Sequence, residues 1–266
     1  MVILVTGASS GIGALCAAQL ARAGHRVWAA SRRATAPEGC TPLAVDVDRD
    51  DSVTQAVAEL IARERRLDAV VQCAGWGLAG AIEDCASAEA QAQFETNFFG
   101  PHRVCRAVLP QMRAQRAGRI VLVSSLAAQV PLPYQAFYAA SKAALSSYAE
   151  ALRLELRPLG VDVVLIEPGN FRTGFTGSRR RASGWTATSA YAAGSEASVR
   201  WMEQDETRAP LPDAVVARIA GALAAPRPAF RHVVVAQAFE RVGAWLRGLL
   251  PWRIYEAVAL RVFRVR

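Results

Sequence analysis

The sequence predicts a doubly wound α/β fold, in which one parallel sheet of about seven strands is covered by helices on both faces. Short apolar runs alternate with helical patterns along most of the chain, as expected for strands buried on both sides. A glycine-rich turn, "TGASSGIG" at 6–13, joins the first apolar run to the first helical pattern. With 266 residues, of which 52% are hydrophobic, the chain is long enough for one large core. These observations indicate a single domain.

The expected strands and helices alternate in order along the chain. Buried strands are expected where apolar residues dominate short runs, at 2–7, 26–31, 41–47, 67–75, 118–128, 161–169 and 230–236. Helical periodicity covers 12–23, 52–64, a stretch from the high 80s to Arg113, and 136–156. Gly24 ends the first helix, and Gly100-Pro101 is expected to distort the third.

No repeat or linker divides the chain, so residues 1–238 are expected to form one domain. Its least regular stretch begins at 170, and the length and position of that stretch predict a substrate lid near 170–207. Residues 239–266 are expected to form a basic amphipathic extension. Up to Pro251, its apolar residues at helical spacing are Phe239, Val242, Trp245, Leu246, Leu249 and Leu250.

The chain is basic, with a formal net charge of +8. Six arginines and two glutamates in 239–266 supply half of that charge, and "SRRR" at 178–181 adds another cluster. The arginines do not alternate with stacking aromatics in a repeating pattern, so nucleic-acid binding is not expected. A phosphorylated ligand or an anionic membrane surface would suit this charge.

Cysteine and histidine usage argues against metal sites and disulfides. The number of cysteines is five, which is odd, and they include no CxxC pair. The three histidines are far apart in the sequence. No basic segment precedes the N-terminal apolar run, and no run approaches the ~20 apolar residues of a membrane span. We therefore expect a cytoplasmic location, with membrane association as the alternative.

The turn after the first strand is suited to bind phosphate. Gly7, Gly11 and Gly13 permit positive φ angles and a close approach of the backbone to a ligand. The helix that begins here presents unpaired N–H groups and the positive end of its dipole. Because a strand precedes the turn and a helix follows it, the pattern predicts a dinucleotide site. Its expected contacts are Gly7, Ser9, Ser10, Gly11, Ile12 and Gly13.

The end of the second expected strand indicates which dinucleotide binds. An acidic residue there would bond the ribose 2′-hydroxyl of NAD, whereas an arginine would hold the 2′-phosphate of NADP. The sequence reads Ser31, Arg32, Arg33, with no acid. It therefore predicts NADP(H) as the cofactor.

Lys142 is the only lysine among the 31 Lys+Arg residues of the chain. It follows Tyr138 by four residues on an expected helix, so the two side chains share one face. A nearby ammonium favours the phenolate and lowers a tyrosine pKa from its reference value near ~10. Such a tyrosine can exchange a proton with a carbonyl or alcohol oxygen. Lysine suits this role because its charge is compact, whereas the arginine fork imposes another geometry.

Several motifs, in order over roughly residues 1–175, resemble those of the classical short-chain dehydrogenase/reductase family. They are "TGASSGIG", the aspartate of "AVDV", "QCAG", "ETNFFG", "LVSS", "YAASK" and "EPGNFRT". The phrases "GWGLAGAIED", "FETNFFG" and "EPGNFRTGF" are most similar to the branch that contains hydroxysteroid and retinol dehydrogenases. The resemblance implies a Rossmann-type fold and hydride transfer between nicotinamide and a ketone, aldehyde or secondary alcohol.

The resemblance also implies catalytic roles. Tyr138 would be the acid in reduction and the base in oxidation, and Lys142 would lower its pKa and bind the nicotinamide ribose. Ser125 matches the serine that polarises the substrate carbonyl, with its neighbour Ser124 as the second candidate. Asn97 matches the residue that holds a proton-relay water.

Further cofactor contacts are implied in the same way, by Asp46, Val47, Cys73, Ala74, Gly75, Pro168, Gly169, Phe171 and Thr173. The chain departs from many relatives at "QCAG", where Gln72 and Cys73 replace two asparagines. This puts the local hydrogen bonding in doubt, and Cys73 is expected to be a small buried filler.

The expected substrate is a hydrophobic small molecule. Segments that line the site in this family carry apolar and aromatic side chains here, chiefly Trp76, Val130, Tyr134, Phe175 and Trp185. The alternative function is a non-catalytic NADP-binding or membrane-surface scaffold protein with the same fold. The 239–266 tail would then contact a membrane, although it would equally suit packing on the body or on a second subunit. The resemblance implies a homodimer or homotetramer.

Overall fold

The computed structural model describes residues 1–265, apart from the side chains of residues 238, 239, 241, 244 and 245. The side chains of Phe239 and Trp245, two positions of the apolar pattern expected in the tail, therefore lie outside the described residues. Arg266 lies outside them entirely.

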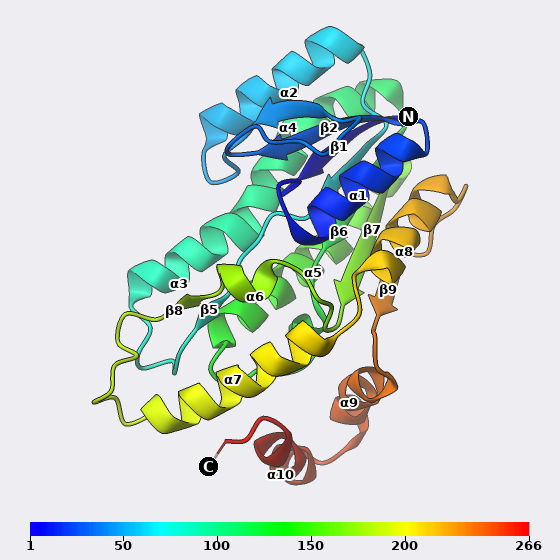
Figure 1. Cartoon of the computed structure of the whole chain (residues 1–266). Helices are drawn as coiled ribbons and strands as arrows, with labels where there is room; N and C mark the ends of the chain where they lie inside the picture. Colours follow the sequence, from blue (N-terminus) through cyan, green and yellow to red (C-terminus); the bar gives the residue numbers. More distant parts are fainter. Residues whose placement is uncertain (266) are drawn as a thin grey trace.

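Seven parallel strands form the main sheet, in the order β3-β2-β1-β4-β6-β7-β9 (Figure 1). Each neighbouring pair is parallel; Val2, for example, lies opposite Arg26. The strands are β1 Val2–Thr6, β2 Arg26–Ser31, β3 Thr41–Ala44, β4 Ala69–Gln72, β6 Gly118–Val123, β7 Val161–Pro168 and β9 Arg231–Val234. The prediction of a single-domain Rossmann-type sheet of seven strands is confirmed, and most strands are shorter than the runs that predicted them.

Helices cover both faces of the sheet because the strands are apolar on both sides. Alternate residues of β1 enter different core clusters, Val2 and Leu4 in one and Ile3 and Val5 in the other. The first cluster is completed by α2 (Asp50–Glu64), α4 (Gly100–Gln115) and α5 (Ala136–Leu156). The second is completed by α1 (Gly11–Arg22) and α8 (Asp213–Ala224).

The strand order reverses at β1, with β2 and β3 on one side and β4 and β6 on the other. In open α/β sheets, ligands bind beyond the carboxyl ends of the strands at such a reversal. The glycine turn after Thr6 and the segment after Gln72 both begin there. This end of the sheet is therefore where the site is expected.

The third predicted helix is interrupted as expected, but the interruption lies directly before Gly100-Pro101 and not at these two residues. It consists of α3 (Ser87–Phe94), a π-helical turn η1 (Glu95–Phe99) and then α4. Pro101 has no N–H to donate to the carbonyl four residues earlier, which belongs to Asn97. The proline therefore leaves one carbonyl without its helical partner, and the wider turn forms around that point.

The segment predicted as a lid contains α6 (Phe175–Ser178), β8 (Arg180–Arg181) and α7 (Ala192–Arg208). Strand β8 pairs in parallel with β5 (Leu78–Ala79), and this two-stranded sheet was not predicted. The pairing joins the lid to the segment that follows β4. Two short 3-10 helices complete the body, η2 (Leu126–Ala128) and η3 (Arg157–Leu159).

Two helices follow β9, namely α9 (Ala238–Leu249) and α10 (Trp252–Val262). Figure 1 shows both beyond the carboxyl end of β9 and next to α7. After α10, the buried ring of Phe263 meets Trp201 of α7, with ring centroids 5.8 Å apart. The tail therefore packs on the segment predicted as a lid.

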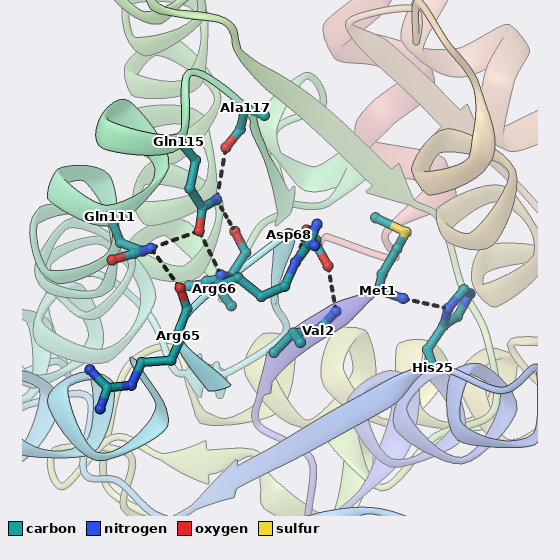
Figure 2. A network of polar contacts seen from close by, with 10 residues as sticks. Met1, Val2, His25, Arg65, Arg66, Asp68, Gln111, Gln115 and Ala117 are labelled. Carbon is teal, nitrogen blue, oxygen red and sulfur yellow. Dashed lines mark hydrogen bonds and ion pairs between the residues drawn. The ribbon is translucent and has the colours of Figure 1, made fainter. Parts of the chain in front are cut away.

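Polar contacts close the opposite end of the sheet, where the central strands begin (Figure 2). The carboxylate of Asp68 accepts hydrogen bonds from the Val2 N–H at 2.6 Å and from Arg66. Gln115 of α4 bonds both the N–H and the carbonyl of Leu67, at 2.9 and 2.8 Å. Burial raises the pKa of Asp68, but the bonds from Arg66 and Val2 outweigh it and hold that pKa below its usual value. A cavity of about 620 Å³ lies at this end of the sheet, opposite the carboxyl ends of the strands, where the active site is expected.

Candidate active site

Glycine is required at two positions of the turn after β1. Gly7 has a φ of +68°, and a Cβ there would lie 2.7 Å from the backbone nitrogen of Ala74. A Cβ on Gly13 would lie 2.3 Å from the carbonyl oxygen of Gly7. Both distances are too short for any side chain, so only glycine lets α1 start this close to β4. The first N–H groups of α1, which lack partners within the helix, are thereby placed to receive a phosphate.

The loop after β7 lies against this turn. A Cβ on Gly11 would lie 3.4 Å from the Cβ of Thr173, and one on Gly174 would lie 3.7 Å from the Cβ of Ser10. The Thr173 hydroxyl accepts a hydrogen bond from the Phe175 N–H at 3.1 Å, which shapes the loop. The structure thus brings together two groups of predicted cofactor residues that are far apart in the sequence.

The end of β2 places two exposed arginines beside the loop after β3. Ser31 is buried, and its hydroxyl lies 3.3 Å from both the N–H and the carbonyl of Thr35. Arg32 and Arg33 follow it and are exposed. Burial raises the pKa of Asp48, and the charge of Arg32 lowers it, so the guanidinium lies near this carboxylate. The arginines therefore border the region predicted to hold the adenosine end.

Asp46 and Val47 follow β3 and shape that region. The Asp46 carboxylate accepts a hydrogen bond from the Asp48 N–H at 3.2 Å, and the Asp46 N–H donates to the Ser52 hydroxyl at 2.9 Å. A Cβ on Gly100 would lie 3.0 Å from Val47 Cγ2. Glycine at position 100 therefore lets α4 approach the loop with the predicted adenine contacts.

Asn97 is fully buried in η1, and its side chain is held by three hydrogen bonds. Its Oδ1 accepts from the Trp76 N–H, and its Nδ2 donates to the Trp76 carbonyl and to Ser141 Oγ, all at 3.1 Å. These bonds tie η1 to the segment after β4 and to α5. Ser141 was not predicted, although it lies next to Lys142 in the "YAASK" motif.

The lone lysine is buried close to Asn97. Lys142 is 6% exposed, and its Nζ donates to the Val123 carbonyl at 3.0 Å. A Cβ on Gly75 would lie 3.6 Å from this Nζ and 3.1 Å from Asn97 Oδ1. Burial lowers the pKa of Lys142 to about 8, while the neighbouring Cys73 raises it. The site therefore holds a compact, buried cation next to Asn97 and Gly75.

Tyr138 lies one turn earlier on α5 and faces the lid. The centroid of its ring is 5.2 Å from that of Phe175. Burial raises the pKa of Tyr138 to about 12, and its hydrogen bond with Ser125 acts in the opposite direction. The expected lowering of this pKa by Lys142 is not observed, because burial of the phenol dominates. A phenol with a raised pKa stays protonated at neutral pH and is suited to donate a proton.

The two candidate serines have different partners. Ser125 caps the start of η2, where its hydroxyl accepts a hydrogen bond from the Ala127 N–H at 3.1 Å, and its interaction with the Tyr138 phenol lowers the pKa of that tyrosine. Ser124 is buried, and its hydroxyl donates to the Lys142 carbonyl at 3.0 Å and lies 2.9 Å from Ser146 Oγ. The Ser124 hydroxyl is therefore occupied inside the core, and the structure places Ser125 beside the tyrosine.

The remaining predicted cofactor residues lie in different surroundings, some in the loop after β4 and one in the core. Cys73, Ala74 and Gly75 follow β4, and burial raises the pKa of the Cys73 thiol to about 12, which agrees with an inert filler. Gln72 donates from Nε2 to the Pro101 carbonyl at 3.3 Å, so the replacement of asparagine still ties β4 to α4. Phe171 is buried in the second core cluster, so its side chain is not available to a cofactor and only its backbone is.

Three of the predicted substrate residues, Phe175, Tyr134 and Trp185, lie beside Tyr138 or beside α7. Phe175 is the one beside Tyr138. A Cβ on Gly77 would lie 2.8 Å from the Phe175 ring, so glycine is needed there. Tyr134 and Trp185 pack beside the inner face of α7 around Met202.

Trp76 and Val130 form a second group, away from that cluster. The Trp76 indole N–H donates to the Thr96 hydroxyl at 3.1 Å, and the guanidinium of Arg180 lies 4.3 Å from its ring centroid. The Val130 N–H donates to the Leu126 carbonyl at 3.2 Å, directly after η2. Trp76 is thereby held between the lid strand β8 and η1.

An ion pair behind Phe175 was not predicted. The Arg179 side chain is almost fully buried and pairs with Glu206 and, at 3.4 Å, with Glu203 of α7. Its guanidinium lies 5.5 Å from the Phe175 ring centroid. Glu206 raises the pKa of Tyr138 and Arg179 lowers it, although both effects are smaller than that of burial. The basic cluster in the sequence was the only signal for this pair.

A second unpredicted contact comes from the tail. Glu240 of α9 is buried, and its Oε1 accepts a hydrogen bond from the Asn170 N–H at 2.7 Å. A Cβ on Gly169 would lie 2.6 Å from the same oxygen. Burial raises the pKa of Glu240, and the bond from Asn170 lowers it. The tail thereby holds the loop predicted to meet the nicotinamide end.

Within residues 1–265, no three His, Cys, Asp or Glu side chains converge as a metal site would require. The five cysteines are free thiols. Among the described helices, none has both the length and the apolar content needed to cross a bilayer.

Comparison with known proteins identifies the family to which the chain is similar. A family model described as short chain dehydrogenase matches residues 1–184. A 3-ketodihydrosphingosine reductase of Bacteroides thetaiotaomicron is 39% identical over 249 residues, which cover 92% of this chain and 93% of that protein.

Solved structures share the fold over nearly the whole chain. A short-chain dehydrogenase from Streptomyces avermitilis has a TM-score of 0.83 at 31% identity, covering 99% of this chain and 97% of that one. A metagenomic short-chain oxidoreductase in complex with NADP has a TM-score of 0.70 at 26% identity, covering 89% and 97%. A Burkholderia phymatum enzyme in complex with NAD, at 22% identity, has a TM-score of 0.79 and covers 93% and 92%.

The glycine turn suits a dinucleotide, because Gly7 and Gly13 let α1 begin close to β4 with its first N–H groups free to bond a phosphate. The family model covers more than half of the chain, and the reductase from Bacteroides covers nearly all of it. The chain is therefore an oxidoreductase of the classical short-chain dehydrogenase/reductase family, on its hydroxysteroid/retinol dehydrogenase-like branch.

Proposed function

We propose that this chain is an NADP(H)-dependent carbonyl reductase or alcohol dehydrogenase that acts on a hydrophobic substrate. The observation that supports this most is the convergence of Ser125, Tyr138 and Lys142 beside the glycine turn. The nicotinamide cofactor, when bound, exchanges the hydride with the substrate. The residues of the chain orient the substrate and supply or remove the proton.

Tyr138 is the proposed proton donor in reduction and the proton acceptor in oxidation. Its raised pKa keeps the phenol protonated at neutral pH, as donation to a carbonyl oxygen requires. The Ser125 hydroxyl, whose interaction lowers the pKa of the same phenol, would donate a second hydrogen bond to that oxygen. The charge of Lys142 would stabilise the phenolate left after proton transfer.

Asn97 is proposed to hold the water that returns a proton to the site. Its side chain is fully used by Trp76 and Ser141, so the side chain serves to position η1. Its carbonyl receives no helical hydrogen bond from Pro101, which has no N–H. That carbonyl is the group we assign to the water.

The proposed preference for NADP(H) rests on the end of β2. Arg32 and Arg33 are exposed there, and 26–37 contains no aspartate or glutamate to bond a ribose 2′-hydroxyl. Arg32 also lies near Asp48, on the loop that borders the predicted adenine contacts. An arginine in this position suits a 2′-phosphate.

Replacing Arg32 and Arg33 together with alanine tests this preference. We expect the KM for NADPH to rise about 10- to 100-fold, because a hydrogen bond to a charged group contributes ~1.5–3 kcal/mol. The KM for NADH should stay within about twofold, since NADH lacks the phosphate. Arg22→Ala, at an exposed arginine at the end of α1, is the control. An equal loss for both cofactors would contradict the assignment.

The choice between the two serines is tested by Ser125→Ala and Ser124→Ala. Ser125→Ala should lower kcat/KM by about 10²-fold, as expected when a donor to the reacting oxygen is removed. Ser124→Ala should instead lower the free energy of unfolding by about 1 kcal/mol, because its bonds to Lys142 and Ser146 are structural. Turnover and urea unfolding of both variants measure this, and the reversed pattern would assign the role to Ser124.

The proposed substrate carries its carbonyl group on an apolar skeleton. Phe175 lies beside Tyr138, and Tyr134 and Trp185 pack on α7 of the proposed lid, which suits such a molecule. The similarity to a 3-ketodihydrosphingosine reductase favours a long-chain amino ketone among hydrophobic ketones.

Titration with NADPH and NADH, followed by NADPH oxidation with hydrophobic ketones and aldehydes, tests the proposed function. The panel includes 3-ketodihydrosphingosine. Turnover that is lost in Tyr138→Phe supports the enzyme. Tight NADPH binding without turnover of any compound, unchanged by substitution of Tyr138 or Lys142, would favour the alternative of a non-catalytic cofactor-binding or membrane-surface scaffold protein.

We also propose a homodimer or homotetramer in the cytoplasm. The feature that supports the assembly is Leu154 on α5, which is 75% exposed although it lies on a helix that the family uses between subunits. Light scattering of the purified chain measures the number of subunits.

A further inference from the structure

Helix α9 has its charged and apolar faces arranged opposite to those of an ordinary surface helix. The two charged residues of α9 whose side chains the structure describes, Glu240 and Arg247, contact the body: Glu240 accepts from the Asn170 N–H, and Arg247 donates to the Gln129 carbonyl. On the other side of the helix, Val242 and Leu249 are 50% and 59% exposed. The apolar side of α9 therefore faces away from the chain that it packs on.

Helix α10 is exposed over most of its surface. Tyr255 is buried, and so is Phe263, the residue directly after the helix. Ile254, Val258 and Val262, spaced four residues apart, form a stripe that is 52%, 48% and 42% exposed. Two further apolar residues, Trp252 and Leu260, are 59% and 44% exposed.

We call these exposed apolar residues the tail face: Val242, Leu249, Trp252, Ile254, Val258, Leu260 and Val262. The seven lie within 25 residues of a chain in which only six other large apolar side chains are described as strongly exposed. A concentration of this kind on a folded protein marks a surface with a partner.

The charge around the tail face selects the kind of partner. Arg253, Arg261 and Arg264 are exposed beside it, and the exposed carboxylate of α10 is Glu256. The whole segment 239–266 carries six arginines against two glutamates. Exposed aromatic and aliphatic residues between arginines are the composition of helices that lie on anionic bilayers.

We propose that the tail face docks on an anionic lipid surface, with α9 and α10 lying in the plane of the interface. The two helices have 12 and 11 residues and are separated by Pro251, so neither could span a bilayer. A second copy of the chain is the weaker candidate, because a symmetric contact between two tail faces would bring their arginines together.

The position of the tail connects this surface with the proposed site, and this step rests on the proposed function. Glu240 holds Asn170 in the loop after β7, and Phe263 packs on Trp201 of the lid helix α7. A bilayer in contact with the tail face would therefore lie next to the lid. A hydrophobic substrate would then reach the site from the membrane without crossing water.

Vesicle sedimentation of the full chain tests the docking. Wild type should bind phosphatidylcholine vesicles that contain phosphatidylglycerol, bind pure phosphatidylcholine weakly, and lose binding as salt is raised. The double variant Arg253→Gln/Arg261→Gln should bind about 25-fold more weakly, since each surface arginine contributes about fivefold. Trp252→Glu/Val258→Glu should not bind, because two carboxylates would enter the apolar layer.

Matched controls separate the tail face from general charge and exposure. Arg22→Gln/Arg157→Gln removes the same charge from exposed positions on the body, and Ile82→Glu alters an apolar residue that is 67% exposed there. Both should bind as wild type does. Wild type that fails to bind anionic vesicles overturns the proposal. So do tail variants that still bind vesicles but lose subunits in light scattering, because they assign the surface to a second copy.

Failure of the docking and failure of the proposed function have different signatures. All tail variants should reduce a short, water-soluble ketone at the wild-type rate, because none of the substituted residues touches Tyr138, Ser125 or Lys142. Vesicle binding without any turnover would refute the proposed function alone. Turnover without vesicle binding would refute the docking alone.

Discussion

Replacing Tyr138 with phenylalanine should lower kcat for carbonyl reduction by about 10²- to 10⁴-fold, the usual contribution of a general acid. The variant removes one oxygen from a half-buried ring that packs on Phe175, so the ring contacts remain. NADPH affinity should change little, since the proposed phosphate contacts lie at the glycine turn. Fluorescence titration and NADPH oxidation under saturating substrate measure the two effects separately.

Tyr148→Phe is the matched control for this substitution. Tyr148 lies on the same helix α5, and its hydroxyl is 3.4 Å from His102 Nδ1, away from the proposed site. Its loss should leave kcat within about twofold, because surface and core hydroxyls away from the reacting atoms affect stability rather than chemistry. Wild-type turnover in Tyr138→Phe would show that the proton comes from another group.

Replacing Lys142 with arginine should also abolish most turnover, although the charge is kept. The Nζ of Lys142 is enclosed by the Val123 carbonyl and by Gly75, where a Cβ would lie only 3.6 Å away. A planar guanidinium is larger and has fixed donor directions, so it would be displaced from this position. We expect kcat/KM to fall by about 10²-fold or more in Lys142→Arg and in the uncharged Lys142→Met.

The pH dependence distinguishes a catalytic charge from a structural one. Burial lowers the pKa of Lys142 to about 8, so kcat/KM for reduction by wild type should fall as the pH rises through about 8. In Lys142→Arg, any residual activity should lack this fall, because arginine stays protonated. A wild-type profile that is flat through this range would exclude a role for the charge of Lys142.

The same pKa makes a prediction about stability. Folding lowers the pKa of Lys142 from 10.5 to about 8, so the unfolded chain binds more protons between these values. The free energy of unfolding contributed by this residue therefore rises with pH across that window. Lys142→Met should lose this rise, and urea unfolding at several pH values measures it.

Features that depend on residues close in sequence were predicted well. All seven strands of the main sheet appear where short apolar runs predicted them, and the central strands are apolar throughout because they are buried on both faces. The spacing of Tyr138 and Lys142 placed both on one face of α5, because helical geometry brings residues four apart together. The glycine turn was predicted for the same reason, since its strained conformation is required locally.

Local pattern did not suffice where the backbone had two ways to satisfy its hydrogen bonds. The interruption of the helix was expected at Gly100-Pro101, but it takes the form of the π-helical turn η1, which ends directly before Gly100. The lowering of the Tyr138 pKa was expected from its spacing to Lys142, whereas burial by the surrounding fold raises it. Burial is a property of the whole packed structure and not of the spacing.

By itself the sequence determined the sheet and the glycine turn after β1, because these follow from local periodicity and residue type, and it supplied the proposed set of reactive side chains. Only the tertiary structure decided that the Ser124 hydroxyl is held by the Lys142 carbonyl and Ser146, and that Phe171 enters the core. It also decided that Glu240 reaches Asn170, 70 residues earlier in the chain. Contacts over such separations depend on how the elements pack, and no short pattern in the sequence records that packing.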